Sequence, residues 1–117
     1  MVLIKLNRFN GSVAGDAVYN IPVVVNENGI AYVEDYTDHM MLTLLCGNTI
    51  RIENMEDFSS EFISGLARYE KKNAVQYKDV HVCRSNITAI LPAQGSGYNI
   101  GFGGNQVNLT VKTLDPL

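Results

Sequence analysis

Short stretches of alternating apolar residues, separated by turn signals, occupy most of this 117-residue chain. In the clearest of them, residues 106–113, Val107, Leu109 and Val111 alternate with polar residues, which is typical of a strand with one buried face. Pairs such as Gly47-Asn48 lie between the stretches and favour the positive-φ turns of β-hairpins. We predict strands at residues 2–6, 17–25, 30–34, 41–45, 49–53, 75–83, 86–91, 98–102 and 106–113. Pro22 confines the second of these strands to a sheet edge or divides it.

One stretch, residues 54–73, has the period of a helix instead. Its apolar residues recur every three or four positions and would share one face: Met55, Phe58, Phe62, Leu66 and Tyr69. Asn54 is a suitable N-cap, and acidic residues near the start and basic residues near the end complement the helix dipole. We therefore predict an amphipathic helix at about residues 55–72, with Phe62 buried against a sheet.

The expected fold is α+β, with a mainly antiparallel β-sheet and one amphipathic helix that covers a face of it. The composition, 46% hydrophobic and 18% charged residues, is ordinary for a soluble globular protein. The length suits a single domain, residues 1–117, with enough chain to bury a core.

The two halves of the chain resemble each other at an offset of 57 residues. This offset pairs Val25 with Val82, Ile30 with Ile87, Val33 with Ile90, Ile50 with Val107 and Ile52 with Leu109. It also aligns Gly47-Asn48 with Gly104-Asn105, so both halves place a turn between apolar strands. We interpret the halves as two related β-meander units, although two unrelated meanders would share much of this pattern.

A family resemblance covers residues 4–66. The opening, Ile4 to Gly11, resembles that of the small FlbD-like proteins encoded beside flagellar genes, and the strands around Gly47-Asn48 and the acidic start at residues 53–58 continue the likeness. The resemblance implies a strand–strand–helix unit and carries over no catalytic residue. The chain departs from that family in residues 12–20 and in its whole second half, and it also looks like an orphan phage or mobile-element protein.

Charge and hydropathy exclude several classes of protein. The net charge of −3 disfavours general nucleic-acid binding, because phosphate contacts need a basic surface. No apolar run approaches the roughly 20 residues of a membrane span, and Lys5 interrupts any signal-peptide core. We expect a cytoplasmic protein without membrane association, in which Cys46 and Cys83 are reduced, unpaired and buried.

Two small clusters have the residue types of reactive sites. The oxygen-rich group Glu34, Asp35, Asp38 and His39 has the composition of a cation site but reads better as a solvated hairpin tip. His81 and Cys83 would share one face of a strand, yet no oxyanion site or orienting group accompanies them. We therefore expect neither a metal, a cofactor nor an enzymatic activity.

The glycine-rich segment at residues 94–105 is the most unusual stretch of the chain. Its glycines would allow a ligand close approach to the backbone, and Tyr98 and Phe102 could stack on a planar group. The segment lacks charge, so an anion would also need an arginine from elsewhere, Arg51 or Arg84. The candidate ligand-binding residues are Arg51, Arg84, Gly97, Tyr98, Phe102 and Asn105; two hairpin turns around a strand are the structural alternative.

The function that these features favour is that of a non-enzymatic binding protein. We expect a homo-oligomer of phage or mobile-element origin that sequesters a small anionic ligand, such as a nucleotide, or inhibits a host protein. The alternative is a structural, assembly or flagellar-accessory subunit.

Overall fold

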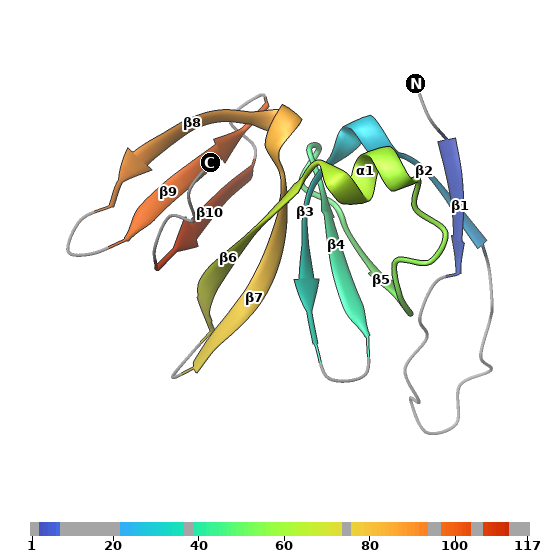
Figure 1. The fold of residues 1–117 in the computed structure, drawn as a ribbon, viewed down its shortest axis with the longest axis horizontal. Coiled ribbons are helices and arrows are strands. Elements are labelled where there is room, and N and C mark those ends of the chain that lie inside the picture. Colours follow the sequence, from blue (N-terminus) through green and yellow to red (C-terminus); the bar gives the residue numbers. More distant parts are fainter. Residues whose placement is uncertain are drawn as a thin grey trace.

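The computed structural model describes residues 3–7, 22–36, 39–73, 76–93, 97–103 and 107–112. These residues form ten strands, one short α-helix and two 3-10 helices (Figure 1). The first half contains β1 (Leu3–Asn7), β2 (Pro22–Asn26), η1 (Glu27–Gly29), β3 (Ile30–Asp35), β4 (Met40–Leu44) and β5 (Thr49–Ile52). Then follow α1 (Ser60–Ser64), β6 (Leu66–Asn73), β7 (Gln76–Cys83), η2 (Arg84–Asn86), β8 (Ile87–Pro92), β9 (Tyr98–Phe102) and β10 (Val107–Val111).

Antiparallel pairing organises the molecule, as the alternating sequence predicts. Eight strands form one sheet in the order β5-β4-β3-β7-β6-β10-β9-β8, and β1 pairs with β2 in a separate two-stranded sheet. Figure 1 shows the β1–β2 pair at one end of the molecule and β8, β9 and β10 at the other. The pairing of β3 with β7 joins the two halves of the large sheet.

The predicted helix at residues 55–72 is wrong over most of its length. The α-helix covers only Ser60–Ser64, and the residues after Gly65 form β6, which pairs with β7 over eight positions. Ala67 and Tyr69 are buried while Arg68 between them is exposed, so this segment alternates with a period of two. Leu66 and Tyr69 would share one face of a helix, but on the strand they pack in different cores. The long ladder with β7 decides in favour of the strand.

Two hydrophobic cores lie on the sheet. The residues of the first core are Val25, Ile30, Val33, Leu42, Ile52, Phe58, Phe62 and Cys83, with Val23, Met40, Leu44, Ile50, Met55 and Leu66 packed against them. The residues of the second core are Ala31, Tyr32, Ala67, Tyr69, Val80, Val82, Ile100, Phe102, Val107, Leu109 and Val111, with Leu45, Ile87, Ile90 and Tyr98 packed against them. Each core includes residues from the other half of the chain: Cys83 is part of the first core and Tyr32 is part of the second.

A buried carboxylate fixes the start of α1. Ser59 is its N-cap, and the Ser59 hydroxyl accepts a hydrogen bond from the Phe62 amide at 3.2 Å. The amide and the hydroxyl of Ser59 in turn donate to the two oxygens of Glu27, at 2.8 and 2.7 Å. Glu27 is only 3% exposed, so this contact ties α1 to η1 in a place where water cannot replace it.

The side chain of Phe62 tests the packing of α1. Phe62 is 8% exposed and lies 4.7 Å from the Phe58 ring, so Phe62→Ala removes buried area and leaves a cavity. We expect the free energy of unfolding to fall by ~3–5 kcal/mol in equilibrium denaturation. Ile63→Ala, at a neighbouring residue that is 40% exposed, is the control and should cost much less. Equal losses for both variants would contradict the observed orientation of α1.

Removal of the Ser59 hydroxyl tests the link between α1 and η1. Ser59→Ala deletes the helix cap and leaves Glu27 with one donor instead of two, so we expect a loss of ~1–3 kcal/mol in unfolding free energy. Ser60→Ala is the matched control, because Ser60 is exposed and contacts only Glu61, at 3.5 Å, in the described structure. A Ser59 variant as stable as the Ser60 variant would show that the buried contact contributes nothing.

Candidate functional site

An open apolar pocket runs along β2. Its volume is about 460 Å³, and its lining residues are Val23, Val24, Val25, Asn26, Gly29, Leu44, Leu45, Cys46 and Ile50. Successive side chains of a strand point to opposite faces, so a pocket that touches four consecutive residues lies along the edge of β2 rather than over one face. This pocket is the candidate site.

The strand order of the described residues leaves this edge of β2 open. Among the described strands β2 pairs only with β1, so its other edge retains backbone donors and acceptors for an incoming strand. Val25 is buried in the first core, whereas Val24 is 62% exposed. None of the lining residues carries a charge. The pocket can therefore take an apolar group or an extended backbone, and it offers no charged side chain to an ion.

A second hollow, of about 380 Å³, lies beside α1. Its lining residues are Glu27, Asn28, Ser59, Glu61, Phe62, Gly65, Cys83 and Ser85. Ser59 satisfies both oxygens of Glu27, and the Cys83 sulfur lies 3.4 Å from the Ser85 hydroxyl. These polar groups serve the packing of α1, and the lining set contains no histidine that could act as a base for Cys83.

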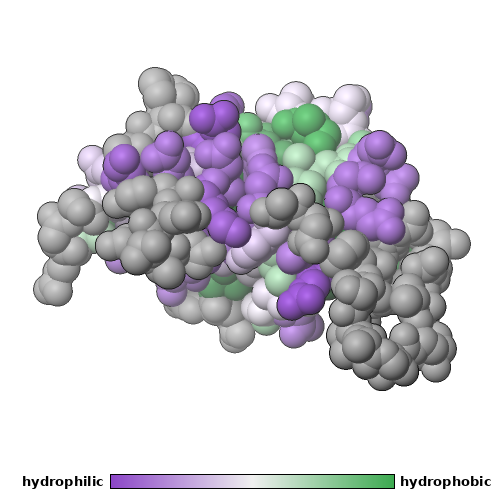
Figure 2. All heavy atoms as spheres, turned by 90° about the horizontal axis from the view of Figure 1, so that it is seen from below, coloured by the Kyte–Doolittle hydropathy of each residue, from purple (hydrophilic) through white to green (hydrophobic). Residues whose placement is uncertain are grey.

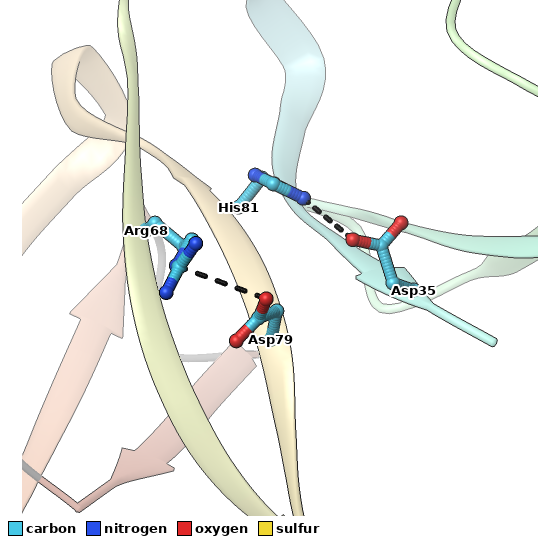
Figure 3. A network of polar contacts seen from close by, with 4 residues as sticks. All are labelled: Asp35, Arg68, Asp79 and His81. Atoms are coloured by element: carbon cyan, nitrogen blue, oxygen red, sulfur yellow. Dashed lines mark hydrogen bonds and ion pairs between the residues drawn. The ribbon is translucent and has the colours of Figure 1, made fainter.

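His81 and Cys83 have different surroundings in the structure. The Nε2 atom of His81 lies 2.8 Å from Asp35 on β3 (Figure 3), whereas Cys83 is buried in the first core. The contact links β3 to β7. Figure 3 also shows Arg68 and Asp79, whose exposed ion pair at 3.7 Å contributes little to stability.

Glu34 and Asp35 of the acidic cluster contact side chains within the described sheet. Glu34 lies 3.3 Å from the ammonium of Lys71 and accepts a hydrogen bond from the Tyr36 hydroxyl at 3.3 Å. Burial and the charge of Glu34 raise the pKa of Tyr36 above its ordinary value, which keeps this phenol protonated. The Tyr36 ring stacks on His39 at 4.9 Å, and Asp38 lies outside the described residues.

Among the described residues no group of three histidine, cysteine, aspartate or glutamate side chains could hold a metal ion. Figure 2 views this end of the molecule from below, and hydrophilic residues cover much of the described part of that face. The interpretation of the cluster as a polar hairpin end suits these contacts better than cation binding does.

The residues predicted to bind an anion lie apart. Arg51 is on β5, at one edge of the large sheet, and β9 with Tyr98 lies next to the opposite edge. Arg84 is in η2, next to Ile87, which pairs with Phe102 rather than with the Tyr98 end of β9. Asn105 lies outside the described residues. The described chain therefore brings neither arginine to Tyr98.

Phe102 and Gly97 have structural tasks. Phe102 is 1% exposed and packs against Tyr32 at a centroid distance of 5.7 Å, so its ring is not accessible to a ligand. Gly97 has a φ of +88°, and a Cβ atom there would collide with the carbonyl oxygen of Val111. This glycine lets the residue before β9 lie against the end of β10.

Sequence reasoning missed the pocket along β2. The signal was the run Val23-Val24-Val25, which is apolar on both faces of a strand that Pro22 confines to an edge. Such a run is typical of a strand that is covered on both faces and has neighbours on both edges, whereas an edge strand has a neighbour on one side only. That conflict could have indicated a binding edge.

Comparison with family models, with curated proteins and with solved structures finds no match for this chain. Within the described part of the chain, no helix has the length and apolar character needed to span a membrane.

The two cysteines should differ sharply in reactivity. Cys46, at the pocket, is exposed and Cys83 is buried, and both are free; the prediction that both thiols are buried is thus wrong for Cys46. A thiol reagent should label one site rapidly in the native protein and two after denaturation. Cys46→Ser should remove the rapid phase, and a rapid phase that survives in this variant would show that Cys83 is accessible.

Proposed function

We propose that this protein is a non-enzymatic binding protein made of two related units, and that it captures an extended polypeptide segment along β2. The observation that carries the proposal is the apolar pocket along the open edge of that strand. An incoming strand would gain backbone hydrogen bonds from β2 and would bury its side chains against Leu44 and Ile50. This is recognition by strand addition, in which the ladder gives affinity and the pocket gives selectivity.

The order and the irregularities of the strands support the relation between the units. Strand, 3-10 helix and three further strands follow one another in β2–β5 and again in β7–β10. The register shifts between Ile30 and Tyr32 where β3 pairs with β4, and between Ile87 and Ala89 where β8 pairs with β9, 57 residues later. A register shift at the same place in two ladders is a specific feature rather than a general property of hairpins.

Nine pairs of residues in the cores or packed against them also correspond. The registers match β4 to β9 at an offset of 58 and β5 to β10 at an offset of 59, so the constant offset of 57 fails after β3 and β8. The matched core residues are Val23 and Val80, Val25 and Val82, Ile30 and Ile87, Val33 and Ile90, Met40 and Tyr98, Leu42 and Ile100, Leu44 and Phe102, Ile50 and Leu109, and Ile52 and Val111. Hereafter the first unit is β1–β5 and the second unit is β6–β10.

The pocket residues and the arginines suit the binding of a nucleotide less well than that of a polypeptide. The pocket has no charged lining residue, and the arginines considered for a phosphate lie away from Tyr98. The second candidate function is that of an assembly subunit, which the FlbD-like resemblance would suit. The open edges of β2 and β8 favour it, because each can pair with another chain.

A dye on Cys46 tests the proposed function. Cys46 lines the pocket, and buried Cys83 should stay unlabelled, so an environment-sensitive maleimide dye reports on the pocket alone. We expect a saturable change in fluorescence on addition of a blocked peptide of alternating valine and threonine. Val24→Lys should abolish it, because the lysine places a charge in the apolar pocket.

The control keeps the same substitution away from the pocket. Ile63→Lys alters an exposed apolar residue of α1, and its titration should match that of the wild type. A fluorescence change that does not saturate, or that Val24→Lys leaves intact, would contradict capture along β2.

A further inference from the structure

Inside the chain, a strand of the first unit covers the edge of β7 in the second unit, and no described strand covers β2 in the same way. There β3 of the first unit pairs with the edge of β7, with Tyr32 opposite Val82, Val33 opposite His81 and Glu34 opposite Val80. Tyr32 reaches into the second core and packs on Phe102, and Leu45 approaches Gly103. In the second unit, therefore, the space beside β7 and the end of β9 is filled by β3.

The equivalent space in the first unit is the pocket. The strand equivalent to β7 is β2, and Leu44 and Leu45 stand where the second unit has Phe102 and Gly103. The pocket lies between the edge of β2 and this end of β4, which is the position that β3 takes beside β7. The strand equivalent to β3 is β8, and among the described strands β8 pairs only with β9.

We infer that the β2 edge and its pocket receive strand β8 of a second copy of this chain. This inference rests on the proposed function and names the captured segment. Transfer of the β3–β7 register through the offset of 57 places Ala89 of one copy opposite Val25 of the other, Ile90 opposite Val24, and Leu91 opposite Val23.

The exposed apolar residues support this contact. Four large apolar side chains are exposed in the described structure: Leu3 (61%), Val24 (62%), Ile63 (40%) and Leu91 (61%). Val24 and Leu91 lie on the two strands that would pair. Leu3 is opposite Asn26 as Leu66 is opposite Cys83, and Leu66 packs against the core of the other unit. Leu3 would cover the second core of the neighbouring copy in the same way.

The β3–β7 contact is polar, whereas the equivalent residues of the proposed β8–β2 contact are apolar. Inside the chain, His81 contacts Asp35 and Lys71 contacts Glu34. The residues equivalent to His81, Asp35 and Glu34 are Val24, Pro92 and Leu91. An apolar surface in place of ion pairs suits a contact that gains its free energy by removing exposed area from water.

The contact joins different surfaces of the two copies, so it is head-to-tail. Each chain would present β2 to one neighbour and β8 to another, and the assembly would close as a ring or extend as a filament. An isologous dimer would instead pair β8 with β8 or β2 with β2.

Two lysine variants test the contact by sedimentation and by size-exclusion chromatography with light scattering. Leu91→Lys places a charge on β8 and Val24→Lys places one in the pocket, at residues whose exposure leaves the fold intact, as thermal unfolding should verify. We expect the wild type to self-associate in the micromolar range, and each variant alone to associate at least about tenfold more weakly. Ile63→Lys should behave as the wild type.

The mixture of the two variants gives the decisive result. The Val24→Lys chain keeps an intact β8 and the Leu91→Lys chain keeps an intact β2, so together they should form a one-to-one dimer that grows no further. A mixture that stays monomeric, or a single variant that still forms the wild-type assembly, would overturn the inference. So would a wild type that stays monomeric throughout the micromolar range.

The peptide titration separates this inference from the proposed function. A monomeric wild type that still binds the valine–threonine peptide at Cys46 would overturn the second copy as occupant and leave capture along β2 standing. A protein that neither binds the peptide nor self-associates would overturn both.

Discussion

The pairing of β3 with β7 is the contact on which the rest of the structure depends. Without it the large sheet would divide into β3–β5 and β6–β10, each with an incomplete core. Tyr32 completes the second core and Cys83 completes the first, so the two cores stabilise each other across this ladder. The Asn86 side chain donates to the carbonyl oxygens of Asn28 and Ile30, at 2.9 and 2.7 Å, and so satisfies backbone acceptors at the start of β3. The same ladder is the template for the proposed contact between copies.

Local sequence was sufficient where one face of a strand meets one core. The alternation of Val107, Leu109 and Val111 predicted β10, and the Gly47 turn separates β4 from β5 as expected. It failed at β6, because Phe62, Leu66 and Tyr69 satisfy a helical period as well as they satisfy a short helix followed by a strand. The decision came from β7, whose eight-position ladder with β6 is a tertiary contact that no local window contains. Glu27 illustrates the same limit, since its partner Ser59 is 32 residues away.

The sequence analysis predicted neither the place nor the chemistry of the candidate site, because it pointed to an anion site and the pocket along β2 is apolar. Glycine-rich composition drew attention to residues 94–105, where Gly97 serves backbone packing and Phe102 fills a core. The sequence offered Arg51 and Arg84 as anion partners because it does not show the order of the strands. The observed order puts Arg51 at the edge of the sheet far from β9. The pocket along β2 arises because, among the described strands, β2 has a neighbour on one edge only, and strand order is a property of topology. Pro22 correctly indicated an edge strand, but the sequence does not indicate which edge of β2 is paired and which is open.

The edges of the sheets are not treated alike, and this difference bears on function. Strand β5 is a short edge of four residues and carries Arg51, an arrangement that discourages pairing with other chains. Strands β2 and β8 carry no charged residue and expose Val24 and Leu91.

Each of these two strands has a proline at one end, Pro22 at the first position of β2 and Pro92 at the last position of β8. If the register transferred from β3 and β7 is continued by one position past Leu91 and Val23, Pro92 lies opposite Pro22. Neither residue can donate a backbone hydrogen bond, so the ladder between copies would end on both strands at the same point. Both edges are apolar over the same few residues and end at prolines, as the two halves of the proposed contact between copies would.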